Sequence, residues 1–469
     1  MERTLCGDIG KSEGKGVTLK GWVDGRRDHG GLIFIDLRDR SGIAQIVFNP
    51  KKHPEAHRTA ESLRTAYVVK ITGEVGKRPK GMENPKIPSG DWEVSAKELE
   101  IINEAETPPL STDDDGYDIG EETRMKYRYL DLRRPRLRKN LKNRARVINF
   151  IRQWLTQRDF TEIETPVLGK STPEGARDYL VPSRIYPGSF YALPQSPQQY
   201  KQLLMVAGLE RYFQIARCFR DEDTRGDRQP EFTQLDLEMS FTDQEEILGL
   251  TEELFTSLVE ELYPAKKITK KPFPRITYKE VMEKYGSDRP DLRKDKNDPN
   301  ELAFAFVVDF PMFEKKDDGT YGVVHHPFTQ PQVKSADELK KSFKKNPLGI
   351  LAHQYDLVLN GSEVGGGSIR THDPALLQAV FEALGNEPEK IRKDFGHILE
   401  AFEYGVPPHG GIAPGLDRLI MILENEPNIR EVIAFPKTGD GRDLLMGAPS
   451  EVDKEQLNEL GLEIKKKKK

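Results

Sequence analysis

A strand–loop–strand pattern between residues 211 and 238 constrains the fold of this chain more than any other stretch. Residues 211–219 read RYFQIARCF and residues 230–238 read PEFTQLDLE, so two β-rich runs are joined by a charged loop. Alternation along the second run places four side chains on one face: Phe232, Gln234, Asp236 and Glu238. The loop holds Arg220, Arg225 and Arg228, and guanidinium groups beside an aromatic ring suit a phosphate chain and a planar base. A surface hairpin laced with salt bridges is the alternative.

The first 105 residues are predicted to form a small β-barrel. β-rich runs at 17–23, 32–37 and 44–48 precede a helical stretch at 54–64, and two more follow at 67–75 and 92–102. Three strands, a helix and two strands is the order of an OB-fold, whose face binds single-stranded nucleic acid. A segment rich in Pro, Gly and acidic residues then predicts a hinge. We therefore expect an OB-fold over 1–105, a hinge over 106–135, a larger α+β domain over 136–455 and a tail over 456–469.

The composition indicates a soluble, cytoplasmic protein. Hydrophobic residues make up 36% and charged residues 32% of the 469 positions, as in globular proteins. No run approaches the roughly 18 apolar residues of a membrane span, and the start, MERTLCGDIG, lacks the pattern of a signal peptide. Cys6 and Cys218 are isolated, without the spacing of a metal site, which is typical of reduced thiols.

Charge is unevenly distributed along the chain, although the net charge is −5. Residues 124–158 are dense in Arg and Lys and contain few acids. The sequence leaves two interpretations of this run open: a solvated helix face, or a basic strip that contacts a polyanion. The terminal run of lysines, 465–469, is most simply a frayed, solubilising tail.

Three runs in order resemble the motifs of the class II aminoacyl-tRNA synthetases. Residues 160–168 (FTEIETPVL) are similar to motif 1, residues 219–238 to motif 2, and residues 410–419 (GGIAPGLDRL) to motif 3. The resemblance implies an antiparallel sheet flanked by helices with ATP bent across it, and a homodimer with Pro166 at its interface. It implies catalytic roles for Arg220, Glu222 and Arg418. It also implies ATP contacts at Arg220, Asp221, Glu222, Gln229, Phe232, Glu363, Gly415, Leu416, Asp417 and Arg418.

Within that class, the runs 171–179, 195–201 and 360–370 resemble those of the bacterial aspartyl enzymes. An aspartate pocket needs fixed cations for the side-chain carboxylate and acceptors for the ammonium group. Arg370 and Lys201 fit the first need, and a histidine pair at 325–326 lies in a run similar to a loop that closes over aspartate. Adjacent residues of a strand point opposite ways, so at most one of the pair need contact substrate, and the resemblance favours His325. From the residues alone, a merely buried or exposed histidine pair is the alternative. The aspartate-binding residues implied are Glu174, Gln198, Lys201, Asp236, His325 and Arg370.

The resemblance also assigns a magnesium site. Asp356 and Glu363 are implied to hold Mg²⁺ on the ATP phosphates, and Mg²⁺ prefers oxygen ligands. From the residues alone they are ordinary acids at strand ends. The glycines at 365–367 allow backbone to come close to a ligand.

In the predicted barrel, the resemblance places tRNA anticodon contacts at Arg27, Phe34 and Gln45. An aromatic side chain stacks on a base and an amide contacts a base edge. Phe34 could instead be core, but alternation places it on the face opposite Ile33 and Ile35. His29 and Gly81 resemble the residues of enzymes that charge both tRNA(Asp) and tRNA(Asn). A plain loop histidine and a plain turn glycine remain the alternative.

The chain departs from the family in one respect, because bacterial aspartyl enzymes carry an inserted domain between motifs 2 and 3. Only a few residues near 294–301 stand at that place, far fewer than the roughly 50 of a small domain. The function expected is ATP- and Mg²⁺-dependent activation of L-aspartate and its transfer to tRNA(Asp) and tRNA(Asn). The alternatives are an enzyme strictly specific for tRNA(Asp), an asparaginyl or lysyl enzyme, and an RNA-binding protein that has lost the chemistry.

Overall fold

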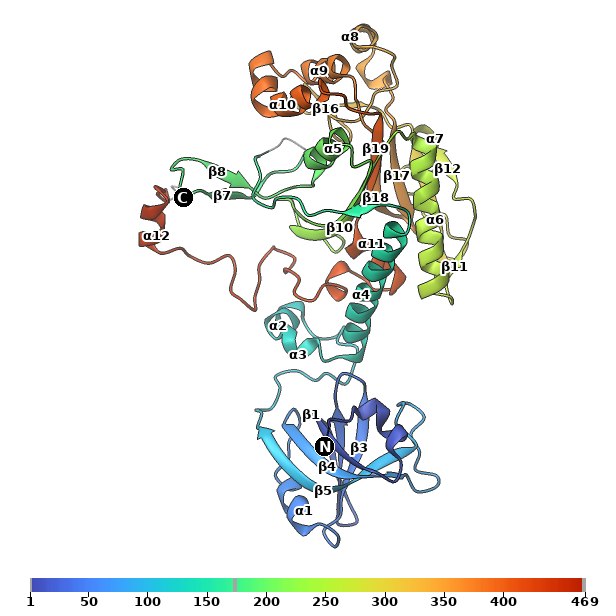
Figure 1. Ribbon diagram of the computed structural model, residues 1–469, viewed down its shortest axis with the longest axis vertical. Coiled ribbons are helices and arrows are strands. Elements are labelled where there is room, and N and C mark those ends of the chain that lie inside the picture. Colours follow the sequence, from blue (N-terminus) through green and yellow to red (C-terminus); the bar gives the residue numbers. More distant parts are fainter. Residues whose placement is uncertain (1, 172–174, 466–469) are drawn as a thin grey trace. The chain divides into compact units, whose positions relative to one another are not determined.

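The first hundred residues form a closed five-stranded barrel in the computed structural model, which describes residues 2–171 and 175–465 (Figure 1). The strands are hydrogen-bonded in the order β1-β2-β3-β5-β4. They are β1 (Gly16–His29), β2 (Leu32–Arg38), β3 (Ile43–Phe48), β4 (Val68–Lys77) and β5 (Trp92–Asn103), accompanied by η1 (Cys6–Ser12) and α1 (Pro54–Ala60). Alternate residues such as Ile33, Ile35 and Leu37 point inward and form the barrel core. The barrel confirms the predicted OB-fold.

The chain divides into two compact units, Met1–Asp114 and Asp115–Lys469. The second unit begins with α2 (Glu121–Lys126) and α3 (Arg128–Asp131), which lie inside the segment 106–135 that we predicted as a hinge. Arg128 and Arg134 are fully buried there because each forms an ion pair with Asp131. The predicted hinge is therefore too long, since its second half is part of the packed second unit.

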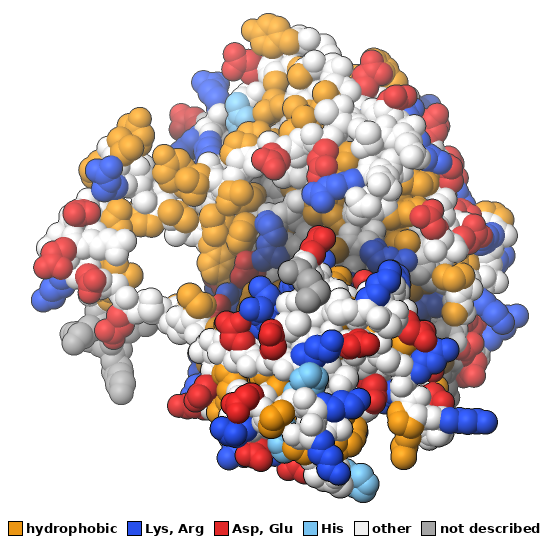
Figure 2. All heavy atoms as spheres, turned by 60° about the horizontal axis from the view of Figure 1, so that its bottom comes forward, with side chains coloured by type: hydrophobic (Ala, Val, Ile, Leu, Met, Phe, Trp, Pro, Cys, Tyr) orange, Lys and Arg blue, Asp and Glu red, His pale blue; other side chains and the backbone are white. Residues whose placement is uncertain are grey.

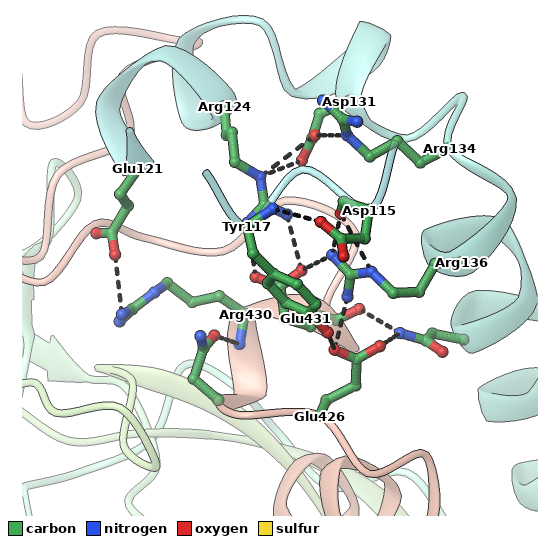
Figure 3. A network of polar contacts seen from close by, with 12 residues as sticks. Asp115, Tyr117, Glu121, Arg124, Asp131, Arg134, Arg136, Glu426, Arg430 and Glu431 are labelled. Atoms are coloured by element: carbon green, nitrogen blue, oxygen red, sulfur yellow. Dashed lines mark hydrogen bonds and ion pairs between the residues drawn. The ribbon is translucent and has the colours of Figure 1, made fainter. Parts of the chain in front are cut away.

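The first part of the basic run 124–158 matches neither of its two interpretations. Arg124 forms ion pairs with Asp131 and Glu431, and Arg136 forms ion pairs with Glu426 and Glu431 (Figure 3). These arginines are neutralised inside the unit by carboxylates that lie about 300 residues later in the chain. On the face seen in Figure 2, Lys and Arg side chains are mixed with Asp and Glu. Removing one member of such a buried cluster typically costs about 3–5 kcal/mol of stability.

An eight-stranded sheet forms the centre of the second unit, in the order β12-β14-β17-β18-β19-β10-β9-β6. The strands are β6 (Thr161–Glu162), β9 (Arg211–Phe219), β10 (Glu231–Ser240), β12 (Arg275–Thr277), β14 (Phe304–Val308), β17 (Gln354–Leu359), β18 (Ser362–Ile369) and β19 (His409–Pro414). The six central strands are antiparallel, as predicted, whereas the short edge strands β12 and β6 pair in parallel. The sheet is therefore mixed at its two edges.

Helices α4 (Pro135–Thr156), α6 (Gln244–Leu262) and α11 (Leu416–Leu423) pack on one face of this sheet. α4 begins with a proline, whose fixed φ suits the first position of a helix. Apolar residues of these helices, such as Ile151, Phe255 and Leu419, share one core with Leu235 and Leu237 of β10. Helix α5 (Gln198–Val206) contacts β10 and β9 and contributes Lys201 to the cavity described below.

The remaining elements surround this centre. The helices are α7 (Tyr278–Tyr285), α8 (Ala336–Lys345), α9 (Pro374–Ala383), α10 (Pro388–Phe402), α12 (Lys454–Glu459), η2 (Pro347–Gly349) and η3 (Ile429–Glu431). The strand pairs are β7 (Leu180–Pro182) with β8 (Phe190–Ala192), β11 (Lys267–Ile268) with β13 (Glu301–Leu302), and β15 (Phe313–Lys315) with β16 (Tyr321–Val323). Only a loop, 286–300, joins α7 to β13, where the inserted domain was expected to be missing. Over 2–171 and 175–465, no helix has both the length and the apolar character needed to cross a membrane.

Candidate active site

The alternation of β10 separates a hydrophobic core from a polar cavity. Leu235 and Leu237 point into the core beneath the helices, whereas Gln234, Asp236 and Glu238 are buried on the opposite face. A cavity of about 360 Å³ lies on that opposite face. Its walls come from α5, the loop between β9 and β10, β18, β19 and the start of α11.

One end of the cavity holds two buried cations and two buried carboxylates. Lys201 Nζ lies 2.9 Å from Asp236 Oδ1 and 3.3 Å from Glu238 Oε2. Arg370 donates from Nε to Glu238 Oε1 at 2.9 Å and from Nη2 to Glu238 Oε2 at 3.0 Å. Burial alone would raise the pKa of Glu238, but Arg370 and Lys201 outweigh it and lower that pKa to about 2. Glu238 is thus ionised and bonded to both cations.

The histidine pair differs from the expectation drawn from strand alternation. Residues 325 and 326 follow β16, with a bend at His325, and both line the cavity, where His326 is buried and His325 is half-buried, with their ring centres 4.3 Å apart. Arg370 Nη1 donates to His326 Nε2 at 2.8 Å. His325 Nδ1 is buried without a hydrogen-bond partner among the residues that the structure describes. His326 therefore orients Arg370, while His325 offers a ring nitrogen to a ligand.

Both rings are electrically neutral near pH 7. Burial, with the positive charges of Arg370, Lys201 and Arg220 nearby, lowers the pKa of His325 to about 3. Burial, with His325 and Arg370 nearby, also lowers the pKa of His326 well below its usual range. A neutral His326 has a lone pair that can accept the Arg370 bond, so the hydrogen bond and the pKa agree.

The other end of the cavity carries arginines and one aromatic ring. The guanidinium carbon of Arg220 lies 5.0 Å from the centre of the Phe232 ring. Arg418 pairs with Asp227 at 3.2 Å and donates to the backbone oxygen of Glu363, and its Nε is buried without a partner within the described part of the chain. A planar base can stack on such a ring, and guanidinium groups can bind a phosphate chain.

Two carboxylates approach each other beside the glycines of β18. A Cβ built on Gly366 would lie 3.2 Å from Asp356 Oδ1 and 3.8 Å from Glu363 Oε1, so both oxygens face the same small space. Burial raises the pKa of Asp356 well above its usual range, and the charge of Glu363 raises it further. A cation between these two carboxylates would stabilise their negative charges. Over 2–171 and 175–465, no group of three or more His, Cys, Asp or Glu side chains has the arrangement of a metal site.

The cavity brings together most of the residues proposed from the sequence. The lining residues among them are Gln198, Lys201, Arg220, Glu222, Gln229, Phe232, Asp236, His325, Glu363, Arg370, Gly415, Asp417 and Arg418. Three others lie elsewhere: Asp221 is 49% exposed beside Arg177, Leu416 packs in the hydrophobic core, and Asp356 stands behind Glu363. Glu174 lies outside the described residues.

The sequence analysis missed three residues that hold Arg370. Glu238 forms the paired bonds described above, His326 accepts from Nη1, and Ser368 Oγ also accepts from Nη1 at 2.5 Å. The alternation of β10 contained a signal for Glu238, since it shares a face with Asp236. No comparable pattern indicated His326, whose direction is set by a bend.

The barrel residues proposed for anticodon contacts point away from the barrel core, although Gln45 is buried, Phe34 is half-buried and Arg27 is exposed. Phe34 is half-buried and outside the barrel core, between the core residues Ile33 and Ile35. It pairs across the sheet with Arg27, whose Nη2 lies 2.9 Å from Asp36 Oδ1. Gln45 faces Asp36 on the next strand and donates to Glu93 at 2.9 Å. Burial raises the pKa of Asp36, and Arg27 partly offsets that effect.

The two residues proposed for tRNA discrimination are both exposed. His29 ends β1, opposite Leu32. Gly81 lies in the loop between β4 and β5 with φ +87°, a conformation that favours glycine, and nothing lies within 4 Å of a Cβ built there. Pro166 is exposed and lines a second cavity of about 250 Å³, beside the exposed side chains of Val167 and Leu168.

Two family models match the chain. The model for tRNA synthetases class II (D, K and N) matches residues 120–439, and that for the OB-fold nucleic acid binding domain matches residues 17–102. Among solved structures, asparaginyl-tRNA synthetase from Pyrococcus horikoshii, complexed with asparaginyl-adenylate, has a TM-score of 0.76 at 23% identity. The match covers 93% of this chain and 98% of that one. Aspartyl tRNA synthetase from Entamoeba histolytica has a TM-score of 0.72 at 23% identity, covering 93% and 91%. These likenesses show the fold.

Curated relatives are more similar in sequence. The aspartate–tRNA(Asp/Asn) ligase of Rubrobacter xylanophilus is 44% identical, covering 96% of this chain and 95% of the relative. The ligase of the same name from Dehalococcoides mccartyi strain CBDB1 is 42% identical, covering 99% of each. The alignment with the first spans 575 positions against the 469 residues of this chain, so more than 100 positions of that relative have no counterpart here. The chain therefore belongs to the class II tRNA synthetases of the D, K and N group, and within them to the family of the aspartate–tRNA ligases.

Proposed function

We propose that this enzyme activates L-aspartate with ATP and transfers it to the 3′ end of tRNA. The observation that carries the proposal is one cavity with a carboxylate-binding end and a phosphate-binding end. Lys201 and Arg370 form the first end, and Arg220 and Arg418 form the second. Aspartate and ATP bound at these ends would meet within the same enclosed space.

The first step needs no nucleophile from the protein. Lys201 and Arg370 bind the side-chain carboxylate of aspartate, which leaves its α-carboxylate directed toward the ATP end. An oxygen of that α-carboxylate attacks the α-phosphorus, and pyrophosphate leaves. Arg220 and Arg418 neutralise charge that develops on the phosphate oxygens, and the fixed geometry of the cavity supplies the alignment. Glu222 orients Arg228 through a 2.7 Å ion pair at the mouth of the cavity.

Asp356 and Glu363 fit a Mg²⁺ ion bound together with the ATP phosphates. Their oxygens face one small space, and burial and mutual repulsion disfavour two unpaired negative charges there. Mg²⁺ commonly takes one or two carboxylates and completes its shell with phosphate oxygens and water. When bound, the ion would neutralise charge on the ATP phosphates, and Asp356 and Glu363 would supply its protein oxygen ligands.

The second step transfers the aspartyl group to tRNA. The 3′-hydroxyl of the terminal adenosine attacks the activated carbonyl, and AMP leaves. We propose that the barrel contacts the anticodon through Phe34, Arg27 and Gln45, because Arg27 and Phe34 are cross-strand neighbours outside the barrel core and Gln45 faces Asp36 on the adjoining strand. Phe34 would stack on a base, and Gln45 would contact a base edge.

We further propose that both tRNA(Asp) and tRNA(Asn) are substrates. The relatives described above are named for both, and the two anticodons differ only at the third base. His29 and Gly81 present an exposed ring and an open backbone, and neither supplies a group that would exclude one pyrimidine.

We propose that the enzyme works as a homodimer in the cytoplasm. Large apolar side chains are exposed beside Pro166 and on the β7–β8 hairpin, and such surfaces typically cover one another in an assembly. They include Val167, Leu168, Leu180, Ile185, Tyr186 and Phe190. Cys6 and Cys218 are buried, unbonded to each other and consistent with a reducing compartment.

Aspartate-dependent exchange of pyrophosphate into ATP tests the first step. The purified enzyme should exchange with aspartate and not with asparagine or lysine at equal concentration. Exchange with asparagine or lysine alone would make it an asparaginyl or lysyl enzyme. Absence of exchange with all three, together with intact tRNA binding, would support an RNA-binding protein without chemistry. Charging of purified tRNA(Asp) and tRNA(Asn) then tests the second step.

A further inference from the structure

Arg144 of α4 and Asp417 of α11 form a buried ion pair behind the nucleotide end of the cavity. Arg144 Nη1 lies 2.5 Å from Asp417 Oδ1 and also donates to the backbone oxygen of Val432 at 3.3 Å. The second carboxylate oxygen, Oδ2, accepts the backbone N–H of Thr233 at 2.8 Å. Asp417 is 3% exposed, whereas the Arg144 side chain is 16% exposed. One carboxylate thus joins three elements: α4, α11 and β10.

The two segments that Asp417 connects each carry a group at the nucleotide end. Phe232 immediately precedes Thr233 in β10, and Arg418 immediately follows Asp417 in α11. Both side chains line the cavity. A shift of the start of α11 relative to β10 would therefore change the separation between the Phe232 ring and the Arg418 guanidinium group.

Arg144 itself does not line the cavity, and the contacts that the structure gives its guanidinium group are those with Asp417 and Val432. Any influence on ATP must pass through Asp417. Without Arg144, the Asp417 carboxylate would be buried beside a single N–H group, which is a costly arrangement that the structure would relieve by moving the first turn of α11.

We propose that Arg144 is a positioning residue for ATP, which holds Asp417 so that Asp417 fixes the spacing of Phe232 and Arg418. The proposal rests on the proposed function, because it needs ATP at this end of the cavity. A displacement of about 1 Å in a binding wall can cost on the order of a hundredfold in rate. The expected effect falls on ATP, since the aspartate end is held by Lys201 on α5 and by Arg370 after β18, and Glu238 lies farther along β10 than Thr233.

The test compares Arg144→Leu with Arg136→Leu in aspartate-dependent pyrophosphate exchange. The two arginines are matched: both lie on α4, both are ion-paired, and their side chains are 16% and 19% exposed. Arg136 pairs with Glu426 and Glu431 and has no contact with Asp417. Arg144→Leu should raise the KM for ATP about tenfold and leave the KM for aspartate within about twofold. Arg136→Leu should change both KM values by less than about twofold, although it lowers the melting temperature to a similar extent.

Two further variants keep the inference testable if Arg144→Leu folds poorly. Arg144→Lys keeps a positive charge beside Asp417 and should bring the KM for ATP back to within about threefold of wild type. Asp417→Asn should raise the KM for ATP on its own, and adding Arg144→Leu to it should raise the KM little further, because both act through one contact. Equal KM values for Arg144→Leu and Arg136→Leu, or additive effects in the double variant, would overturn the inference. Absence of exchange by the wild-type enzyme would instead overturn the proposed function.

Discussion

Arg370 and Glu238 face each other through two parallel hydrogen bonds of 2.9 and 3.0 Å, and both side chains are fully buried. This paired geometry fixes the plane of the guanidinium group. His326 and Ser368 bind Nη1 from the side, so the orientation of Arg370 is determined by three partners. The pocket is therefore organised around a cation before any ligand arrives.

Arg370→Leu should abolish aspartate binding and spare ATP binding. The substrate carboxylate would lose a charge-assisted contact worth about 1.5–3 kcal/mol, and Glu238 would keep only Lys201 as a partner. Breaking a buried pair also typically lowers the free energy of unfolding by about 3–5 kcal/mol. The KM for aspartate in pyrophosphate exchange and the affinity for ATP alone are the measurements. Glu238→Gln is a more conservative second variant, which should raise the KM for aspartate although Arg370 is still present. An unchanged aspartate KM in Arg370→Leu would show that the carboxylate binds elsewhere.

Local alternation predicted the parts of the fold that depend on neighbours in sequence. Ile33 and Ile35 were placed on the face of a barrel strand opposite Phe34, and Asp236 was placed on the same face of its strand as Phe232, because a period of two is visible within a few residues. The order of strands and the helix predicted the OB-fold for the same reason. Alternation is visible within a short segment, and the structure keeps it because one face of each strand must be buried.

Partners far apart in the sequence could not be predicted in this way. Arg136 was read as part of a solvated face or a polyanion-binding strip, yet Glu426 neutralises it from 290 residues away. The hydrogen bond between Arg370 and His326 could not be predicted, because strand alternation was assumed for this pair and the chain bends at His325 instead. The magnesium and anticodon residues came from resemblance, since nothing in their local pattern distinguishes them from ordinary acids or surface residues.

The enzyme should lose stability as the pH falls below 6.5. Burial lowers the pKa of His409 to about 4, although the charge of Glu238 and the hydrogen bond to the backbone oxygen of Pro407 act in the opposite direction. The unfolded chain takes up a proton near pH 6.5, whereas the folded chain resists until about pH 4. The contribution of neutral His409 to the free energy of unfolding is therefore fully present above pH 6.5. It decreases between pH 6.5 and 4, by at most about 1.4 kcal/mol per pH unit. His325 acts in the same direction, with a pKa of about 3.

Urea unfolding at several pH values between 7.5 and 5 measures this slope. His409→Gln should make the free energy of unfolding depend less steeply on pH, because glutamine keeps hydrogen-bonding capacity but takes up no proton on unfolding. Glu238 adds to the loss only at lower pH, since its pKa of about 2 lies below the ordinary 4.5. A slope that is the same in wild type and His409→Gln would contradict the assignment of a neutral buried ring.

Phe34→Ala should weaken tRNA charging and leave pyrophosphate exchange unchanged. The ring lies on the outer barrel surface, and stacking of a base on an aromatic side chain is worth about 1–3 kcal/mol. The tRNA KM should therefore rise about fivefold or more, with the melting temperature retained. Ile35→Ala on the same strand provides the contrast, because Ile35 is fully buried and its truncation should cost about 2–5 kcal/mol of barrel stability. A melting temperature of Phe34→Ala as low as that of Ile35→Ala would show that Phe34 is a core residue.

The wild-type enzyme should charge both tRNA(Asp) and tRNA(Asn), with kcat/KM values within about tenfold, a gap of roughly 1.4 kcal/mol. The reason is that His29 is exposed and that nothing lies within 4 Å of a Cβ built on Gly81, so neither position offers a group expected to exclude a pyrimidine at the third anticodon base. Replacing His29 by Leu and Gly81 by Lys should reduce charging of tRNA(Asn) more than that of tRNA(Asp).

Because Gly81 has φ +87°, any side chain there introduces backbone strain, so Gly81→Ala is the control that separates strain from the added lysine. Gly81→Ala should affect the two tRNAs equally. If the unmutated enzyme charges tRNA(Asp) and leaves tRNA(Asn) uncharged, relaxed tRNA choice is excluded, and the enzyme is strictly specific for tRNA(Asp).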